Sequence, residues 1–64
     1  MTVVFTANLH DEEDMVVAIC QQVEVVSQGE TEQLALANIR EAVALYFDLP
    51  VEMVVVLRGK YGEQ

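Results

Sequence analysis

Cysteine, basic residues and long apolar runs are scarce in this chain, which has one cysteine and three Lys or Arg among 64 residues. Because Cys20 has no second cysteine to pair with, an internal disulfide is excluded, and a domain this small fits a reducing compartment or an oligomer. The first residues lack a basic segment followed by a long apolar stretch, so we expect no secretory signal and a cytoplasmic location. No apolar run approaches the roughly 20 residues that cross a bilayer, so we expect no membrane-spanning helix.

The shortage of basic residues leaves the chain strongly acidic. Eleven Asp and Glu against three Lys and Arg give a formal net charge of -8. Such a charge repels phosphate backbones and anionic lipids, and Arg58 and Lys60 are too few to form a nucleic-acid patch. We therefore expect no direct binding to nucleic acid or to membranes. The same field attracts a basic protein surface and favours a basic protein partner.

Hydrophobic patterning predicts a single α+β domain. With 53% hydrophobic residues the chain is too apolar to be disordered, and its length leaves room for one core. Apolar segments bounded by polar turns predict strands over residues 2–9, 15–20, 23–26 and 51–57. The resulting order is β-β-β-α-β, with one helix packed on a four-stranded mixed sheet. We assign the domain to residues 1–57 and a polar C-terminal tail to residues 58–64.

The helix is predicted between Thr31 and Pro50. Thr31 is a suitable N-cap because its hydroxyl can accept a hydrogen bond from a first-turn amide, and Pro50 disfavours helical geometry in the residue before it. The apolar side, expected to pack on the sheet, comprises Ala35, Leu36, Ile39, Ala42, Val43, Tyr46 and Phe47. The opposite side comprises Gln33, Ala37, Arg40, Glu41, Ala44 and Asp48.

Both faces of the predicted sheet are apolar. Val16 and Ala18 alternate with the equally apolar Val17 and Ile19, and residues 53–57 follow the same two-sided pattern. One helix can cover only one face, whereas a sheet that is apolar on both sides must be covered on both. We therefore expect the second face to meet another subunit in a homo-oligomer.

Several segments carry the motifs of a known family. The chain reads VVAICQQV over residues 16–23, VSQGET over residues 26–31 and LALANIREAVALY over residues 34–46. These segments resemble the HicB-like antitoxin family, whose members typically read Tyr-Val-Ala-x-Cys-Pro-Glu-Leu, then Ser-Gln-Gly-Asp-Thr, then a helix containing Asn-Ile-x-Glu-Ala. The similarity extends from about Thr2 to Phe47.

The resemblance implies a β-β-β-α-β domain, described as reduced ribonuclease-H-like or double-stranded-RNA-binding-like, that forms dimers or tetramers. Family members usually neutralise HicA, a small basic ribonuclease toxin, and often bind their operator through a C-terminal DNA-binding module. The sequence ends at Gln64, so we expect no such module, and Gln21-Gln22-Val23 replaces the usual Pro-Glu-Leu. The function implied is a protein-binding module that occludes a basic, HicA-like toxin. The alternative is an orphan oligomeric protein of this fold that has no toxin partner.

Five helix residues are candidate partner-binding residues: Leu34, Asn38, Glu41, Leu45 and Asp48. Leu34, Asn38 and Leu45 lie on the flank between the buried and polar sides of the predicted helix. They either pack on an edge of the sheet or contact a partner, with Glu41 at the rim of that contact.

We predict no catalytic, metal or cofactor site. Residues 11–14 are acidic but lack the ligand spacing of a cation-binding loop, so they are interpreted as a solvated hairpin turn. His10 has no nucleophile or second histidine beside it to complete a catalytic set. Cys20 lies in an apolar strand and is expected in the core. Gly29 is expected to adopt a positive φ in the turn into the helix.

Overall fold

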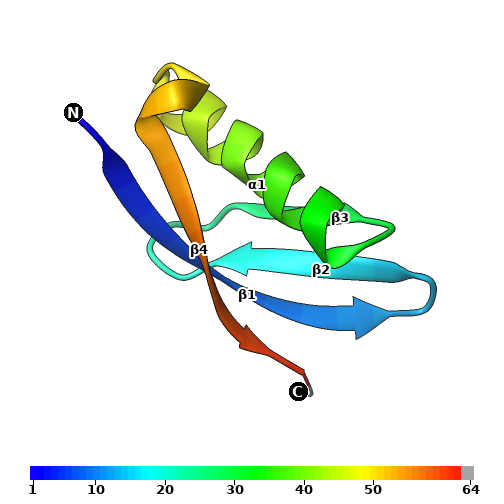
Figure 1. The fold of residues 1–64 in the computed structure, drawn as a ribbon. Coiled ribbons are helices and arrows are strands. Elements are labelled where there is room, and N and C mark those ends of the chain that lie inside the picture. The colour runs from blue at the N-terminus through cyan, green and yellow to red at the C-terminus, as the bar shows by residue number, and fades with distance from the viewer. Residues whose placement is uncertain (63–64) are drawn as a thin grey trace.

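The computed structural model describes residues 1–62 and consists of one helix packed on one face of a four-stranded sheet (Figure 1). Its elements are β1 (Val3–Glu12), β2 (Met15–Cys20), β3 (Val26–Gly29), α1 (Glu32–Phe47), the short 3-10 helix η1 (Val51–Met53) and β4 (Val54–Tyr61). The strand order is β3-β2-β1-β4. Because β1 is antiparallel to β2 and parallel to β4, the sheet is mixed. The predicted α+β class and the β-β-β-α-β order are confirmed.

The core lies between α1 and the face of the sheet that it covers. Ala35, Ile39 and Val43 are fully buried and recur every four residues, so they form one stripe along the helix. The buried residues of the core are Phe5, Ala7, Leu9, Val16, Ala18, Cys20, Val25, Ala35, Ile39, Val43, Ala44 and Val54. The prediction that Cys20 belongs to the core is therefore confirmed.

The first hairpin is longer than the sequence predicts. β1 continues to Glu12, where it still pairs with Met15, and the turn is made by Glu13 with a φ of 57°. The expected polar turn over residues 10–14 is wrong for His10, Asp11 and Glu12. Backbone ladder bonds do not depend on side-chain polarity, so the strand persists after its apolar alternation ends.

The third strand is shifted relative to the prediction, because β3 starts at Val26 and includes Gly29. Its register is fixed by antiparallel pairing with β2, in which Gly29 lies opposite Val16. The expected positive φ at Gly29 is wrong, since Gly62 is the one glycine with a positive φ among residues 1–62. Glycine is required at position 29 by close packing instead: a Cβ would lie 2.6 Å from the Ala35 backbone N.

Both ends of α1 are capped. The Leu34 backbone N–H donates to Thr31 Oγ1 at 3.1 Å, which confirms the predicted N-cap. The helix ends two residues before Pro50, at Asp48, which has left-handed backbone geometry with a φ of 58°. The backbone N–H of Asp48 donates to the carbonyls of Ala44 and Leu45, and thus satisfies two terminal acceptors.

In the last turn of α1, the buried and exposed side chains differ from the prediction. The buried stripe advances in steps of four, so it leads to Phe47, whereas Tyr46 lies beside it and is 61% exposed. Phe47 is itself 42% exposed but stacks on Phe5, with ring centroids 5.5 Å apart. Ala44, predicted on the solvent side, is buried because the chain folds back over it: the Leu49 N–H donates to the Ala44 carbonyl at 2.8 Å.

The C-terminal strand also extends beyond its predicted end. β4 begins at Val54, after η1, and continues to Tyr61, so the expectation of a polar tail is wrong for residues 58–61. Side chains of β1 hold this segment, because Asn8 Oδ1 accepts a hydrogen bond from the Lys60 backbone N–H at 2.9 Å. Residues 63–64 of the predicted tail lie outside the described residues.

Candidate functional site

Four of the five candidate partner-binding residues lie in α1, and the fifth, Asp48, is its C-cap. Leu34, Asn38, Glu41 and Leu45 follow one another at steps of four and three residues, which places them on one side of the helix, and all five candidates are exposed. We call Leu34, Asn38, Glu41, Leu45 and Asp48 the helix stripe. Leu45 is 81% exposed and Leu34 is 48% exposed, so two large apolar side chains of the stripe lie in solvent between acidic ones.

The sheet-edge interpretation of this flank holds for Asn38 and fails for Leu45. Asn38 packs on the sheet edge, because its side-chain amide donates to the Gln28 carbonyl of β3 at 2.8 Å. The Leu34 backbone and Cβ approach Gly29, but half of its side chain remains exposed. Leu45 is too exposed to pack on a sheet edge, and that interpretation is wrong for it.

The carboxylates of the helix stripe have no ion-pair partner among the described residues. Within residues 1–62, neither Glu41 nor Asp48 forms an ion pair, and no basic residue lies in the last turn of α1. Asp48 therefore adds negative charge to the negative end of the helix dipole. These groups give this end of the helix a negative potential that the chain does not neutralise.

Arg40 was missed by sequence reasoning as a structural residue, because helical periodicity assigns it to the solvent side. Its Nε donates to the Val54 carbonyl at 2.7 Å and its Nη2 donates to the Val51 carbonyl at 2.9 Å. The guanidinium thus ties α1 to η1 and the start of β4. No signal in the sequence points to these carbonyl partners, since backbone acceptors leave no residue pattern.

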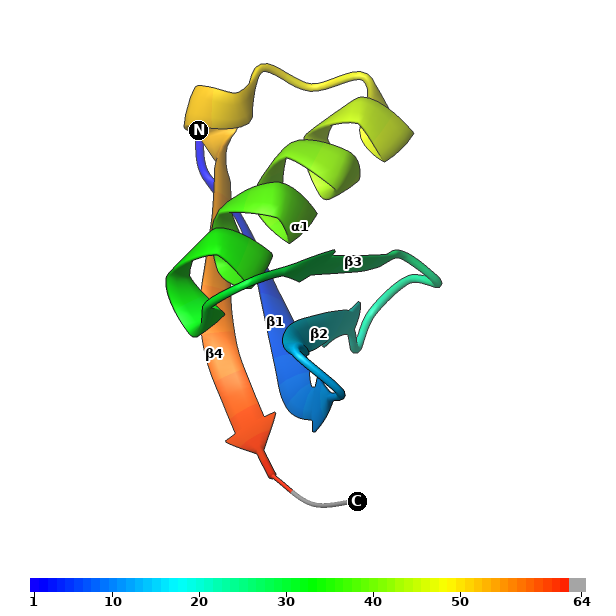
Figure 2. The same cartoon turned by 90° about the vertical axis from the view of Figure 1, so that its right-hand side faces the viewer.

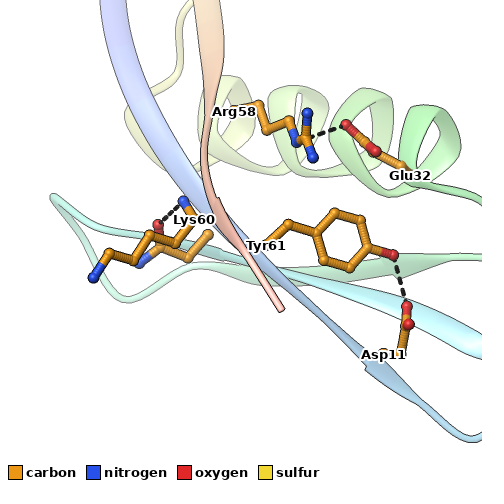
Figure 3. Close-up of polar contacts among 6 residues, drawn as sticks. Asp11, Glu32, Arg58, Lys60 and Tyr61 are labelled. Atoms are coloured by element: carbon orange, nitrogen blue, oxygen red, sulfur yellow. Dashed lines mark hydrogen bonds and ion pairs between the residues drawn. The ribbon is translucent and has the colours of Figure 1, made fainter. Parts of the chain in front are cut away.

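The other two basic residues lie on opposite sides of β4 (Figure 3). Arg58 points toward α1, where its Nε lies 3.0 Å from Glu32 Oε2, and its guanidinium is 5.5 Å from the Tyr61 ring centroid. Lys60 points the other way and makes no ion pair within the described part of the chain. All three basic residues are therefore engaged or directed away from the helix stripe.

The end of β4 is held to β1 by a second polar contact. The Tyr61 hydroxyl donates to Asp11 Oδ1 at 2.6 Å (Figure 3). This hydrogen bond to a carboxylate, with smaller contributions from desolvation and nearby negative charge, raises the pKa of Tyr61 above its ordinary value of 10.0. A surface hollow lies beside this contact and is lined by residues 8–12 and 60–62.

This hollow contains polar side chains but no assembled chemical centre. His10 Nε2 lies 3.8 Å from Glu12 Oε2, and both side chains are at the surface. Within residues 1–62 no group of three or more His, Cys, Asp or Glu side chains converges as metal ligands would. The hollow therefore offers polar contacts without a recognisable nucleophile or metal centre.

The second candidate surface is the sheet face away from α1. No element of residues 1–62 covers it (Figure 2). Apolar residues from all four strands lie on this side: Val4, Val17, Ile19, Val26, Val55 and Leu57. We call these residues and the polar side chains between them the open face. Val4, Val26 and Leu57 are each more than half exposed, so the face is apolar and accessible in the single chain.

Comparison of the chain with protein-family models, with curated proteins and with solved structures gives no significant match. Among residues 1–62, α1 is the longest helix, and it is too short and too polar to span a membrane.

Proposed function

We propose that this chain is a protein-binding module of the HicB-like antitoxin type, which binds a small basic partner through the helix stripe. The observation that carries this proposal is the occurrence of exposed leucines together with carboxylates that form no ion pair within the described residues, along α1 and at its C-cap. Leu34 and Leu45 supply apolar contact area, and Glu41 and Asp48 supply negative charge. Apolar anchors with charged neighbours are the typical pattern of a helix that binds in a groove of its partner.

Electrostatics supports a basic partner. The net charge of -8 creates a negative field that accelerates encounter with a basic protein. Arg40 bonds to backbone carbonyls and Arg58 pairs with Glu32, so neither forms an ion pair with a carboxylate of the stripe. In a HicB-like module the partner is a basic ribonuclease toxin in the cytoplasm, and binding occludes it without any catalytic step by this chain.

The alternative proposal is an orphan oligomer of the same fold without a toxin partner. The open face favours it, because that surface supports self-association whether or not a toxin exists. The two proposals differ in one genetic observation. A toxin partner predicts that the neighbouring reading frame encodes a small basic protein with a lone histidine.

The experiment is a pull-down with the tagged chain from native lysate, at low and high salt, with recovered proteins identified by mass spectrometry. A basic protein lost at high salt is the expected partner, because salt screens charges beyond about 8 Å at physiological ionic strength. Its association rate is then measured for the double variant Glu41→Lys and Asp48→Lys. We expect a rate at least about tenfold lower than for the native chain.

The matched control is the double variant Asp14→Lys and Glu24→Lys. Both residues are exposed in loops outside the helix, and the change in net charge is the same. The stripe variant should slow association more than this control. An acidic partner, or equal rates for the two variants, contradicts binding through the stripe.

A further inference from the structure

We propose that the exposed ring of Tyr46, at the C-terminal end of α1, binds the guanidinium of an arginine side chain on the basic partner. This inference deepens the proposed function and rests on it, because the basic partner is what brings the arginine to this surface. Tyr46 and its neighbour Phe47 lie outside the helix stripe. Three observations carry the inference: exposed aromatic rings, backbone carbonyls without donors, and a carboxylate without a cation.

The aromatic side chains at this end of α1 reach into solvent. Tyr46 is 61% exposed and Phe47 is 42% exposed, and their rings meet edge to face with centroids 4.9 Å apart. Phe47 also stacks on the buried Phe5, which anchors the exposed pair to the core. The face of an aromatic ring attracts a cation, and a guanidinium stacks there more readily than an ammonium because it is planar and more weakly hydrated.

Backbone acceptors are also free at this end of the helix. The residue four positions after Tyr46 is Pro50, which has no N–H to continue the helical hydrogen bonds. Within residues 1–62, the carbonyls of Tyr46 and Phe47 accept no hydrogen bond. A guanidinium has five N–H donors, so one that stacks on a ring here still has donors for such oxygens. The negative end of the helix dipole favours the same cation.

The chain itself combines a tyrosine, an arginine and a carboxylate at the other end of α1. There the Arg58 guanidinium pairs with Glu32 and lies 5.5 Å from the Tyr61 ring centroid, the one cation–π contact within residues 1–62 (Figure 3). The C-terminal end of α1 has the ring and the carboxylate of Asp48, but no basic residue in its last turn. At a rise of 1.5 Å per residue, Tyr46 lies about 21 Å along the helix from Glu32, so Arg58 cannot serve both ends. The missing cation therefore comes from another molecule.

Charge decides which molecule supplies that cation. A second copy of the chain has the same net charge of -8 and three basic residues, of which Arg40 and Arg58 are already bonded within the chain. An anionic lipid surface is repelled by this charge and offers no guanidinium. A basic protein carries arginines and is attracted by the negative field. The Tyr46 ring, the free carbonyls and Asp48 therefore fit an arginine of a basic protein.

The test compares two peptides of equal charge, hexaarginine and hexalysine, titrated into the purified chain at low ionic strength and followed by NMR. We expect the native chain to bind hexaarginine at least about threefold more tightly than hexalysine, with shifts in the Tyr46 ring signals. Tyr46→Leu keeps an apolar side chain but removes the aromatic face, so it should abolish this preference. Tyr46→Phe keeps the face and should retain the preference.

The matched control is Tyr61→Leu, which removes the other tyrosine ring, already occupied by Arg58, and should leave the preference for arginine unchanged. Circular dichroism verifies that each variant is folded. If Tyr46→Leu does not fold, nuclear Overhauser contacts between the arginine side chains and the Tyr46 ring of the native chain decide instead. Glu41→Lys tests the stripe separately, because it should weaken both peptides equally and keep the preference. If it weakens neither peptide while the preference holds, the electrostatics of the stripe are wrong and the arginine site stands.

Three outcomes overturn the inference. A native chain that does not bind hexaarginine, or binds both peptides equally, has no site selective for a guanidinium. A preference that survives Tyr46→Leu, or an absence of contacts to the Tyr46 ring, places the arginine elsewhere. Tyr46 ring signals that change with chain concentration in the absence of peptide show that a second copy covers the ring.

Discussion

Replacing Gly29 with alanine tests the close packing between β3 and the first turn of α1. The added Cβ would lie 2.6 Å from the Ala35 backbone N and 2.8 Å from both the Leu34 carbonyl carbon and its Cβ. These atoms belong to the helix backbone or are attached directly to it, so a rotamer change cannot relieve the clash. The helix must move away from β3, which opens the adjoining core at Ala35.

The expected loss of unfolding free energy is about 2 kcal/mol. Alanine in place of a glycine with ordinary φ normally stabilises by ~0.4–1 kcal/mol through the unfolded state. Overpacking a tight site costs typically ~1–3 kcal/mol and occasionally more. The clash therefore outweighs this gain, and the variant is less stable than the native chain. A domain of 64 residues has about 3–10 kcal/mol in total. Urea unfolding at one fixed protein concentration should therefore show a midpoint lower by about 0.7 to 2 M.

The matched control is Gly59→Ala. A Cβ there meets Asn8 Oδ1, Thr6 Cγ2 and Gln21 Nε2, which are all side-chain atoms that can rotate away. This variant should lose less stability than Gly29→Ala. A Gly29→Ala protein as stable as the native chain would show that β3 and α1 are not packed this closely, and the stated reason for glycine at this position would be wrong.

Two further predictions concern the polar contacts of β4. Arg40→Met keeps the length of the side chain but removes its hydrogen bonds to the Val51 and Val54 carbonyls. Urea unfolding should show a loss of about 2 kcal/mol in unfolding free energy. An unchanged midpoint would show that these hydrogen bonds do not stabilise the fold. Asp11→Asn should lower the pKa of Tyr61, because the carboxylate raises it. The stabilisation from this contact is present below pH 10.0 and is lost as the pH rises through the raised pKa of Tyr61. Identical tyrosinate absorbance titrations of the variant and the native chain would contradict the predicted difference in the pKa of Tyr61.

Features with a local sequence signal were predicted correctly. The N-cap at Thr31 follows from a hydroxyl residue before an apolar-periodic segment, and its hydrogen bond to Leu34 is present. The burial of Cys20 follows from its apolar strand. The second apolar face was also predictable, because residues such as Val17 and Ile19 break the polar alternation of a half-exposed strand. All five residues of the helix stripe are exposed, four in α1 and Asp48 at its C-cap, and their role in partner binding stays a prediction.

Features that depend on contacts distant in sequence were not predicted. The start of β3 is set by pairing with β2, and the clash at Gly29 involves a helix turn rather than its own φ. β4 extends through Lys60 because Asn8, 52 positions away, accepts its backbone hydrogen bond. Helical periodicity fails at Arg40 because a long side chain reaches carbonyls beyond its own side of the helix.

The helix stripe and the open face lie on opposite sides of one sheet, and this geometry separates partner binding from self-association. α1 covers the face that contains Ala7 and Ala18, whereas the open face contains Thr6 and Ile19, so no side chain of the strands can serve both (Figures 1 and 2). Self-association through the open face would direct both helices outward and leave both stripes free. Charge reversal on the stripe should then affect encounter with a basic partner while the solution mass of the chain stays constant, because the carboxylates of the stripe are absent from the open face.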